Sequence, residues 1–409
     1  MNQETIYFLK ILKKILHPET ECLIAEEVDW TRVVQLARVH NVLPLFQEEA
    51  VHYASYIERP AYVDEMQEVL AIVATQVKHT EVFLKLYQDF VKVGVYPIVM
   101  KGLICRELYG KFADHRPSGD EDILIRPLEY QKVKAVLTAN GFITEVDVVT
   151  EAQLEQLQEI TFVNPSEKVC IELHLNPMGR ENDVHSRMSD CFKNVFDNYR
   201  EVEVRGVMVR TMSHYDHLLF LILHAARHFM AEGFGVRQML DILLYQERYG
   251  LEIETSMLYE TLRKFRLEKL WADMLYIGNT YLGFTIPMLY EPNCPEELLG
   301  DLISCGVFGN DTQAKRVAGR MLFLSTGNYL KQKSDNRLLS IWKIIFPSKG
   351  YMLKNAPYLQ EKPWLLPLEW IKRWVRFARK SCKKDGVLSD ESAKIKERRK
   401  SLLKKYNLV

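Results

Sequence analysis

Apolar residues recur at helical spacing through the first part of the chain. The segment 31–51 carries them at i, i+3 and i+4, and Pro44 predicts a break or a new helix start within it. Residues 64–92 form a long amphipathic pattern that ends at Gly94, a residue suited to a helix C-cap. These patterns predict a helical N-terminal region over residues 1–92.

From Val95 the apolar positions alternate with a period of two, which is typical of half-buried strands. The pattern predicts strands at 96–100, 120–126, 141–147, 160–163, 168–175, 202–204 and 207–210, with helices at 102–110, 127–140 and 151–158. After Thr211 the strands stop, and a helix over 214–230 opens a run of helices broken by glycines and prolines. The expected divisions are the helical region 1–92, an α/β core 93–212, a helical domain 213–345, and an irregular linker with a basic C-terminal helix over 346–409.

The composition is that of a soluble globular protein. Of the 409 residues 47% are hydrophobic and 26% are charged, and the formal net charge is zero, so no global positive field points to a nucleic-acid partner. No apolar run is long enough for a membrane span, and the first residues lack the pattern of a signal peptide. Seven cysteines without a C-x-x-C pair favour reduced thiols. A cytoplasmic location without a membrane partner is therefore expected.

Positive charge is concentrated at the C-terminal end. Residues 371–409 contain 14 Lys or Arg against 4 Asp or Glu. Such a segment can bind RNA, DNA or anionic lipid, or it can form a solvated helix with a basic face. Trp370, Trp374 and Phe377 fall at i, i+4 and i+7, which indicates one packed helical stripe and favours the second interpretation.

The segment Gly119-Asp120-Glu121-Asp122-Ile123 carries the strongest chemical signal. Alternate residues of a strand project to the same face, so Asp120 and Asp122 lie together if the segment is extended. Two carboxylates held this close repel each other unless a cation compensates them, and hard oxygen ligands suit Mg²⁺ or Mn²⁺. A solvated acidic turn is the alternative, but an apolar strand follows directly. The pattern indicates metal-dependent phosphoryl or nucleotidyl transfer.

A second strand supplies a further acid. In Val169–Leu175 the apolar residues take one face, while Cys170, Glu172 and His174 take the other. If this strand lies beside 120–125, Glu172 completes an Asp-Asp-Glu set around one or two metal ions, as base or as metal ligand. The alternative for Glu172 is an exposed position on the sheet.

Motifs along the chain form a recognisable set. They are His40-Asn41-Val42-Leu43-Pro44-Leu45, Lys101-Gly102, Leu108-Tyr109-Gly110, Arg116-Pro117-Ser118-Gly119-Asp120-Glu121-Asp122-Ile123-Leu124-Ile125, Ile171-Glu172-Leu173-His174 and Leu223-His224-Ala225-Ala226-Arg227-His228. Together they resemble the bacterial nucleotidyltransferase-like proteins, distant relatives of the abortive-infection toxin and kanamycin nucleotidyltransferases in the DNA polymerase β superfamily. The resemblance covers residues 30–245.

This resemblance implies an α+β fold, with a mixed sheet and flanking helices between helical N- and C-terminal regions. It also implies Mg²⁺ at Asp120 and Asp122 and a triphosphate near Gly102. Two residues depart from the family pattern. Leu103 stands where a second Gly or Ser is usual, which leaves Lys101 as a substitute phosphate contact. Glu121 replaces an apolar residue, so its face of the sheet must be exposed or its charge paired.

A row of histidines on the helix over 214–230 is a third candidate feature. His217, His224 and His228 lie at i, i+7 and i+11, along one stripe. A metal site is one interpretation, but a substrate-facing or structural row is favoured. We expect His224 or His228 to approach the cleft from the helical domain, where they and His174 are possible acceptor-site residues.

Arginines near these motifs have two interpretations each. Arg116 is expected to contact phosphate or to order its loop through a salt bridge. Arg237 and Asp241 are spaced i, i+4 on one helix, which favours an intrahelical ion pair.

The sequence therefore predicts a metal-dependent nucleotidyltransferase that moves NMP from an NTP to an unidentified acceptor. The acceptor is a small molecule, a protein or RNA, and pyrophosphate is released. Predicted catalytic and metal-binding residues are Asp120, Asp122 and Glu172, with Mg²⁺ or Mn²⁺ as cofactor; predicted nucleotide-binding residues are Lys101, Gly102, Arg116 and Gly119. The alternatives are a non-catalytic nucleotide-binding or scaffold relative, favoured by Leu103, and an RNA-directed toxin-like transferase, favoured by the basic C-terminus.

Overall fold

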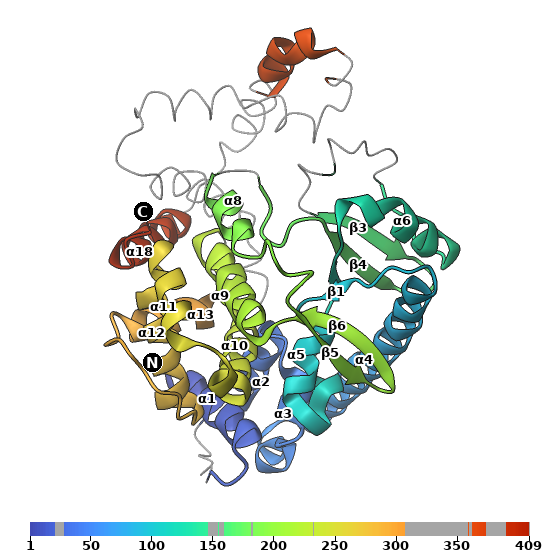
Figure 1. Cartoon of the computed structure of the whole chain (residues 1–409). Helices are drawn as coiled ribbons and strands as arrows, with labels where there is room; N and C mark the ends of the chain where they lie inside the picture. The colour runs from blue at the N-terminus through green and yellow to red at the C-terminus, as the bar shows by residue number, and fades with distance from the viewer. Residues whose placement is uncertain are drawn as a thin grey trace.

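A computed structural model describes residues 1–20, 28–145, 154, 159–180, 183–231, 233–306, 359, 362–373 and 390–408. Within these ranges a six-stranded open sheet is flanked by helices, and a larger group of helices packs beside it (Figure 1). The predicted α+β class with a mixed sheet is confirmed. None of the described helices has the length and apolar character needed to cross a membrane.

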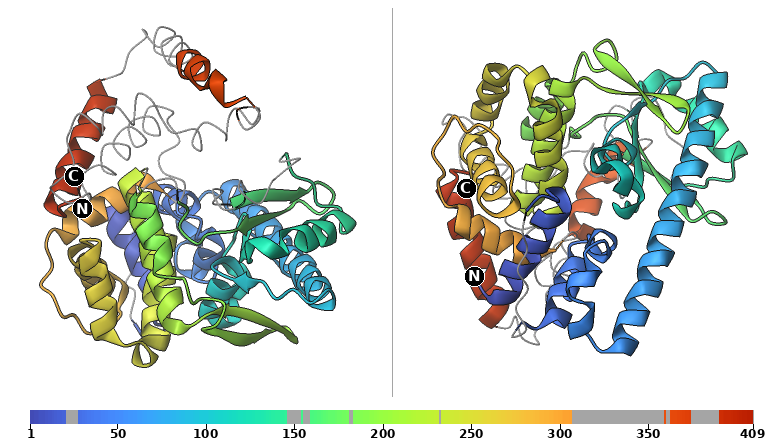
Figure 2. Two further views of the ribbon diagram at one scale, coloured as in Figure 1. Left: turned by 45° about the horizontal axis from the view of Figure 1, so that its top comes forward. Right: turned by 90° about the horizontal axis from the view of Figure 1, so that it is seen from below.

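Helices form the N-terminal part of the chain, as the apolar spacing predicts. They are α1 (Gln3–Leu16), α2 (Trp30–Val39), α3 (Leu43–Gln47), the short turns η1 (Ala50–His52) and η2 (Ala54–Tyr56), and α4 (Arg59–Lys92). The predicted break falls between α2 and α3, and Gly94 follows the end of α4 with φ +74°. The long helix α4 runs beside the sheet (Figure 2).

Strands and short helices alternate through the middle of the chain. The elements are β1 (Ile98–Val99), α5 (Gly102–Arg106), η3 (Glu107–His115), β2 (Glu121–Leu124), η4 (Pro127–Glu129), α6 (Tyr130–Ala139), β3 (Glu159–Asn164), β4 (Val169–His174), α8 (Asp183–Asp190), β5 (Tyr199–Val204) and β6 (Val207–Met212). The strand order is β3-β4-β2-β1-β6-β5. The pairs β2–β4 and β1–β6 are parallel, whereas β1–β2, β3–β4 and β5–β6 are antiparallel.

Helices make up the described remainder of the chain. They are α9 (His214–Ala231), α10 (Val236–Tyr249), η5 (Gly250–Glu252), α11 (Thr255–Lys264), α12 (Glu268–Ile277), η6 (Gly278–Leu282), α13 (Pro295–Cys305), η8 (Pro363–Leu365) and α18 (Asp390–Lys405). Both chain ends lie on this helical side (Figure 2).

The described residues form two large hydrophobic cores, besides a small cluster around Leu359. One joins α1–α3 to α9–α13 and to the end of α18, and it contains Trp30, Trp271 and Tyr406. The other lies between the sheet, the second half of α4 and α6. Because one core spans the first 57 residues and the C-terminal half, segments far apart in sequence are packed as a unit. The predicted four-part division stays a prediction.

Some expected elements differ in extent or lie outside the described residues. Both predicted hairpins are present as β3–β4 and β5–β6. Of the strand predicted over 141–147, the described part contributes one bridge, between Ile143 and Val163. Most of the helix predicted over 151–158 and the aromatic positions Trp374 and Phe377 lie outside the described residues.

Candidate active site

Two neighbouring parallel strands bring the predicted acids together. In the register of β2 and β4, Asp122 lies opposite Glu172 and Leu124 lies opposite His174. Glu172 and His174 are two residues apart on β4 and project to one face of the sheet. The structure thus places Asp122, Glu172 and His174 side by side, as the strand alternation predicted for the first two.

The donor atoms of these three residues converge. His174 Nε2 lies 2.9 Å from Asp122 Oδ1 and 3.7 Å from Glu172 Oε2. One donor atom from each residue lies within 4.8 Å of the others, a grouping that can hold a metal ion. The other oxygen of Asp122, Oδ2, is buried and has no hydrogen-bond partner among the described residues. Two carboxylates and an imidazole are ligands for a divalent cation.

Charge interactions shift the pKa values within this cluster. Burial opposes the ionised form of Asp122, but the charges of Lys101 and His174 outweigh it and hold the pKa of the carboxyl well below its usual range. Burial likewise disfavours the imidazolium of His174, yet hydrogen bonds to Asp122 and Glu172 raise its pKa to about 9. Burial and the charges of the two nearby aspartates raise the pKa of Glu172 to about 7. His174 therefore donates from Nε2 to Asp122.

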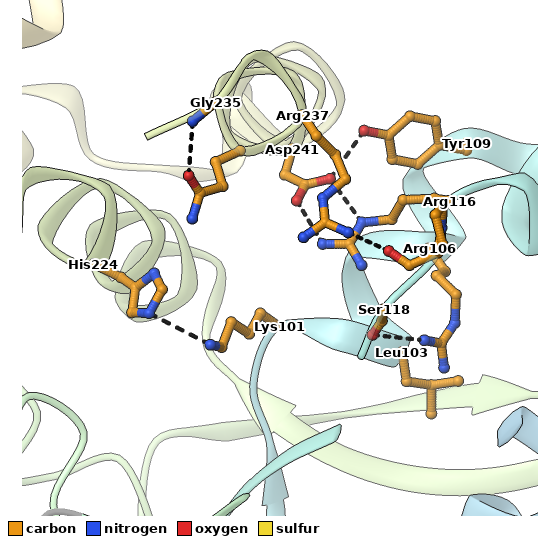
Figure 3. Close-up of polar contacts among 12 residues, drawn as sticks. Lys101, Leu103, Arg106, Tyr109, Arg116, Ser118, His224, Gly235, Arg237 and Asp241 are labelled. Atoms are coloured by element: carbon orange, nitrogen blue, oxygen red, sulfur yellow. Dashed lines mark hydrogen bonds and ion pairs between the residues drawn. The ribbon is translucent and has the colours of Figure 1, made fainter. Parts of the chain in front are cut away.

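Lys101 connects the acids with the helical domain. Its Nζ lies 3.1 Å from Asp122 Oδ1 and 3.4 Å from Nε2 of His224 on α9 (Figure 3). Burial disfavours its charge, but Asp122, Asp120 and Glu172 more than compensate and raise the pKa of Lys101 above its ordinary value. The lysine is thus a fixed cation above the acid cluster.

Two of the three predicted histidines face this cation. The rings of His224 and His228 meet edge to face with centroids 4.6 Å apart. Burial, then the positive charge of Lys101, lowers the pKa of both, to about 4 for His228. His217 lies elsewhere, buried with its Nδ1 3.3 Å from Thr211 and its ring against Tyr245. The row is therefore divided between the site and the core.

Asp120 occupies the loop before β2 and is partly exposed. Its charge raises the pKa values of Lys101 and Glu172, so its carboxylate lies near both. The loop is fixed at Ser118, whose N–H donates to Gln76 Oε1 at 2.8 Å and whose hydroxyl donates to the Asp120 carbonyl at 2.9 Å. Helix α4 therefore positions the segment that carries the first acid.

Glu121 is paired on the opposite face of the sheet. Its Oε1 lies 2.6 Å from Arg106 Nη2, and its Oε2 accepts a 2.9 Å hydrogen bond from the backbone N–H of Leu103. Gly102 has φ +42°, and a Cβ there would lie 2.3 Å from Glu121 Oε2. This carboxylate therefore leaves no space for a side chain at position 102, and its pairing with Arg106 accounts for a charged residue at position 121.

Arg116 forms a buried fork with Asp241 of α10. Its Nε and Nη2 donate to the two carboxylate oxygens at 2.9 and 2.6 Å, and Tyr109 donates to the same carboxylate at 2.9 Å (Figure 3). This salt bridge supports the interpretation that Arg116 orders its loop. The expected ion pair between Arg237 and Asp241 is wrong, because no salt bridge between these two described residues is formed and Arg116 takes the carboxylate.

Arg237 is a residue whose position the sequence interpretation missed. Its guanidinium lies beside Arg116, donates to the carbonyl of Pro117, and keeps its Nε buried without a partner in the described structure (Figure 3). Burial and the charge of Arg116 lower its pKa to about 10, while the charges of Asp241 and then of Asp120 act in the opposite direction. A cation next to the acid loop with no carboxylate partner there can receive an anionic ligand. Its i, i+4 spacing to Asp241 concealed this role.

Gly119 lies in an exposed part of the same loop, and a Cβ there would meet nothing within 4 Å. A side chain could therefore be added at Gly119 without a clash. Of the predicted nucleotide-binding residues, Lys101 lies at the acids, Gly119 is exposed, and Gly102 and Arg116 are enclosed by protein contacts.

Comparison with known proteins places this geometry in a family. A family model described as an uncharacterised nucleotidyltransferase matches residues 26–283, which include the sheet, the acids, Lys101 and helices α9 to α12. No curated protein and no solved structure matches the chain.

Proposed function

Because this chain belongs to the uncharacterised nucleotidyltransferase family, we propose that it is a metal-dependent enzyme that transfers NMP from an NTP to an acceptor. The observation that carries the proposal is the register of Asp122 opposite Glu172, with a buried oxygen of Asp122 that lacks a partner in the described structure. Asp120, on the adjoining loop, is proposed as the remaining acid. A divalent ion held there would neutralise phosphate charge and acidify an acceptor hydroxyl.

The proposed reaction is a displacement at the α-phosphorus of the NTP. The acceptor oxygen forms a bond to that phosphorus, the bond to the bridging oxygen breaks, and pyrophosphate leaves with the electron pair. Glu172 is proposed to take the acceptor proton, because its side chain is 25% exposed whereas that of Asp122 is fully enclosed.

Two cations are proposed to contact the triphosphate. Lys101 lies at the acids and Arg237 lies next to the Asp120 loop, so they flank the space where the phosphates would meet the carboxylates. Gly119 leaves the backbone open to a phosphate. Gly102 and Arg116 are proposed to act indirectly, by fixing α5 and the loop. We propose that the acceptor binds on the α9 side, near His224 and His228. The chemical class of the acceptor is to be identified by the labelling experiment described below.

A nucleotide-binding relative without catalysis is the second candidate. It is favoured by one observation: Lys101 and His174 both contact Asp122 Oδ1, so cations of the chain already compensate this carboxylate. Against the RNA-directed alternative stands one observation: Arg399 and Lys405 of α18 pair with Asp301 and Glu297 of α13.

The test is incubation of the purified protein and a cell extract with each α-³²P-labelled NTP and Mg²⁺ or Mn²⁺. Label transfer to an extract component is expected, and Asp122→Asn is expected to abolish it. Glu172→Gln should keep nucleotide affinity within a few-fold and lower the rate roughly 10²-fold or more. The control variant is Glu203→Gln, which removes an exposed carboxylate on the edge strand β5. This variant should transfer label as the wild type does. Nucleotide binding without any label transfer would favour the non-catalytic relative.

A further inference from the structure

We propose that His174 is itself a ligand of the divalent ion, and that the site therefore selects Mn²⁺ over Mg²⁺. The inference rests on the proposed function, since it specifies the ion and the ligands of that same site. It changes the ligand set from carboxylates alone to two carboxylates and an imidazole nitrogen.

Distances between the donor atoms support this ligand set. Neighbouring ligands of a six-coordinate ion at about 2.1 Å lie about 3 Å apart. His174 Nε2 is 2.9 Å from Asp122 Oδ1 and 3.7 Å from Glu172 Oε2. An ion can therefore enter among these three atoms after only small side-chain movements. When it binds, it must also displace the proton that His174 donates to Asp122.

A second observation concerns the other carboxylate oxygen of Asp122. Asp122 is 1% exposed, and its Oδ2 has no hydrogen-bond partner within the described ranges. Leaving a buried carboxylate oxygen unpaired is costly, so a ligand that pairs it stabilises the site. In the strand register Asp122 lies opposite Glu172.

The surroundings can accommodate the added charge. Lys101 lies 3.1 Å from Asp122 Oδ1 but also 3.4 Å from His224 Nε2, so it can leave the carboxylate for its second partner. The outer nitrogen of His174, Nδ1, lies 3.9 Å from Glu159 Oε2. A carboxylate on the outer side of an imidazole strengthens that imidazole as a metal ligand.

The nature of the donors decides the ion. Mg²⁺ takes oxygen ligands and keeps several waters, whereas imidazole nitrogen suits first-row transition metals. Carboxylate and phosphate oxygens in the same sphere suit Mn²⁺. A site with one nitrogen and two carboxylates therefore fits Mn²⁺.

Electron spin echo envelope modulation of the Mn²⁺-loaded full-length protein, without nucleotide, tests the ligand directly. We expect modulation from directly bound ¹⁴N that changes to the ¹⁵N pattern when histidine alone is ¹⁵N-labelled. His174→Asn should remove it, and His115→Asn, at a histidine that pairs with Glu48, should not. If His174→Asn does not fold, the comparison of unlabelled with ¹⁵N-histidine-labelled wild-type protein still tests whether a histidine binds the ion.

The second readout is a competition between Mg²⁺ and Mn²⁺ for the site. The electron paramagnetic resonance signal of free Mn²⁺ measures how much Mn²⁺ remains unbound. Mn²⁺ should bind at least about tenfold more tightly than Mg²⁺, and His174→Asn should reduce that ratio toward one. Bound Mn²⁺ without histidine modulation, or an unchanged ratio in His174→Asn, would overturn the inference and leave the proposed function intact. If neither ion binds, whether nucleotide is present or absent, both the inference and the proposed function are overturned.

Discussion

Arg116 and Asp241 form a two-point salt bridge in which both side chains are 5% exposed, although 125 residues separate them in the chain. The pair joins the loop before β2 to helix α10, and therefore joins the acid-bearing sheet to the helical domain. Its position explains how a partly exposed loop holds Asp120 in place. The same pair leads to the first prediction.

Asp241→Asn should destabilise the protein by about 3–5 kcal/mol, because it leaves the Arg116 guanidinium buried without a countercharge. Urea unfolding followed by circular dichroism measures the change. The control is Glu68→Gln, which breaks a pair with Arg38 whose two side chains are each 38% exposed. That change should cost at most about 1 kcal/mol. Equal losses in the two variants would show that burial does not set the strength of the pair.

Substitution of Arg237 should weaken nucleotide binding, whereas loss of the Arg116 pair should lower the stability of the fold. Arg237→Gln removes a half-buried cation that has no carboxylate within salt-bridge distance in the described structure, so the stability of the folded protein should change little. The affinity for Mg²⁺– or Mn²⁺–NTP should fall by at least about tenfold, since charge-assisted contacts to phosphate are lost.

Isothermal titration with NTP, together with thermal unfolding, separates these two effects. The matched control is Arg248→Gln on the same helix, where the arginine is exposed and donates to the carbonyl of Glu107 at 2.8 Å. A loss of stability in Arg237→Gln with unchanged nucleotide affinity would return Arg237 to a structural role.

The site shows which features a single sequence can predict. Alternation along two strands was sufficient to predict that Asp122 and Glu172 occupy one face, since a strand fixes side-chain direction locally. The i, i+4 spacing of Arg237 and Asp241 was misleading, because the buried partner Arg116 comes from a distant loop. The charge of Glu121 within an apolar strand could not be explained from the sequence, because its partner Arg106 lies at the end of α5. The two side chains pair on the face of the sheet opposite Asp122.

Gly102 is predicted to be essential for folding rather than for phosphate approach. Gly102→Ala places a Cβ 2.3 Å from Glu121 Oε2 at a φ of +42°, so the carboxylate must leave the Leu103 N–H and Arg106. A loss of about 2 kcal/mol or more in unfolding free energy is expected. Gly119→Ala meets nothing within 4 Å and should change stability by less than about 0.5 kcal/mol. If Gly102→Ala folds normally but no longer binds NTP, the phosphate-loop interpretation is restored.

His40 gives the protein a predicted acid sensitivity. It is fully buried between the α10 N-terminus and α13: its Nδ1 accepts from the N–H of Val236 and its Nε2 donates to the carbonyl of Ile303, both at 3.3 Å. Burial lowers the pKa of His40 to about 4, and the carbonyl of Ile303 only partly offsets this. A proton on Nδ1 would oppose the N–H of Val236.

The sign follows from the two pKa values. The unfolded chain binds a proton on His40 below about pH 6.5, whereas the folded chain does so only below about pH 4, so stability is lost as pH falls through this interval. Between pH 7 and pH 5 His40 should cost about 2 kcal/mol. Urea unfolding at both pH values should show a loss smaller by this amount in His40→Gln. An identical pH dependence in wild type and variant would mean that other groups cause the acid sensitivity.

The basic C-terminal helix is predicted to stabilise the fold and not to bind RNA. Leu402, Leu403 and Leu408 lie in the main core, and Tyr406 donates to the buried carboxylate of Asp273 at 2.5 Å. Arg399 of the same helix contacts Asp301 at 2.7 Å. These contacts come from residues beyond the stripe of Trp370, Trp374 and Phe377, so the expectation that this stripe packs stays a prediction.

Tyr406→Phe should therefore cost about 1–3 kcal/mol in unfolding free energy, because a buried carboxylate loses a donor. Removal of residues 390–409 should destabilise the fold, because Leu402, Leu403 and Tyr406 lie in the main core. Charge reversal at the exposed Lys400 and Lys404 keeps the core residues and isolates the electrostatic role. A gel shift with total RNA across a salt series should show no specific complex for wild type or for this variant. A wild-type complex whose affinity falls steeply with salt, and which is absent in the charge-reversal variant, would instead establish α18 as an RNA-binding helix.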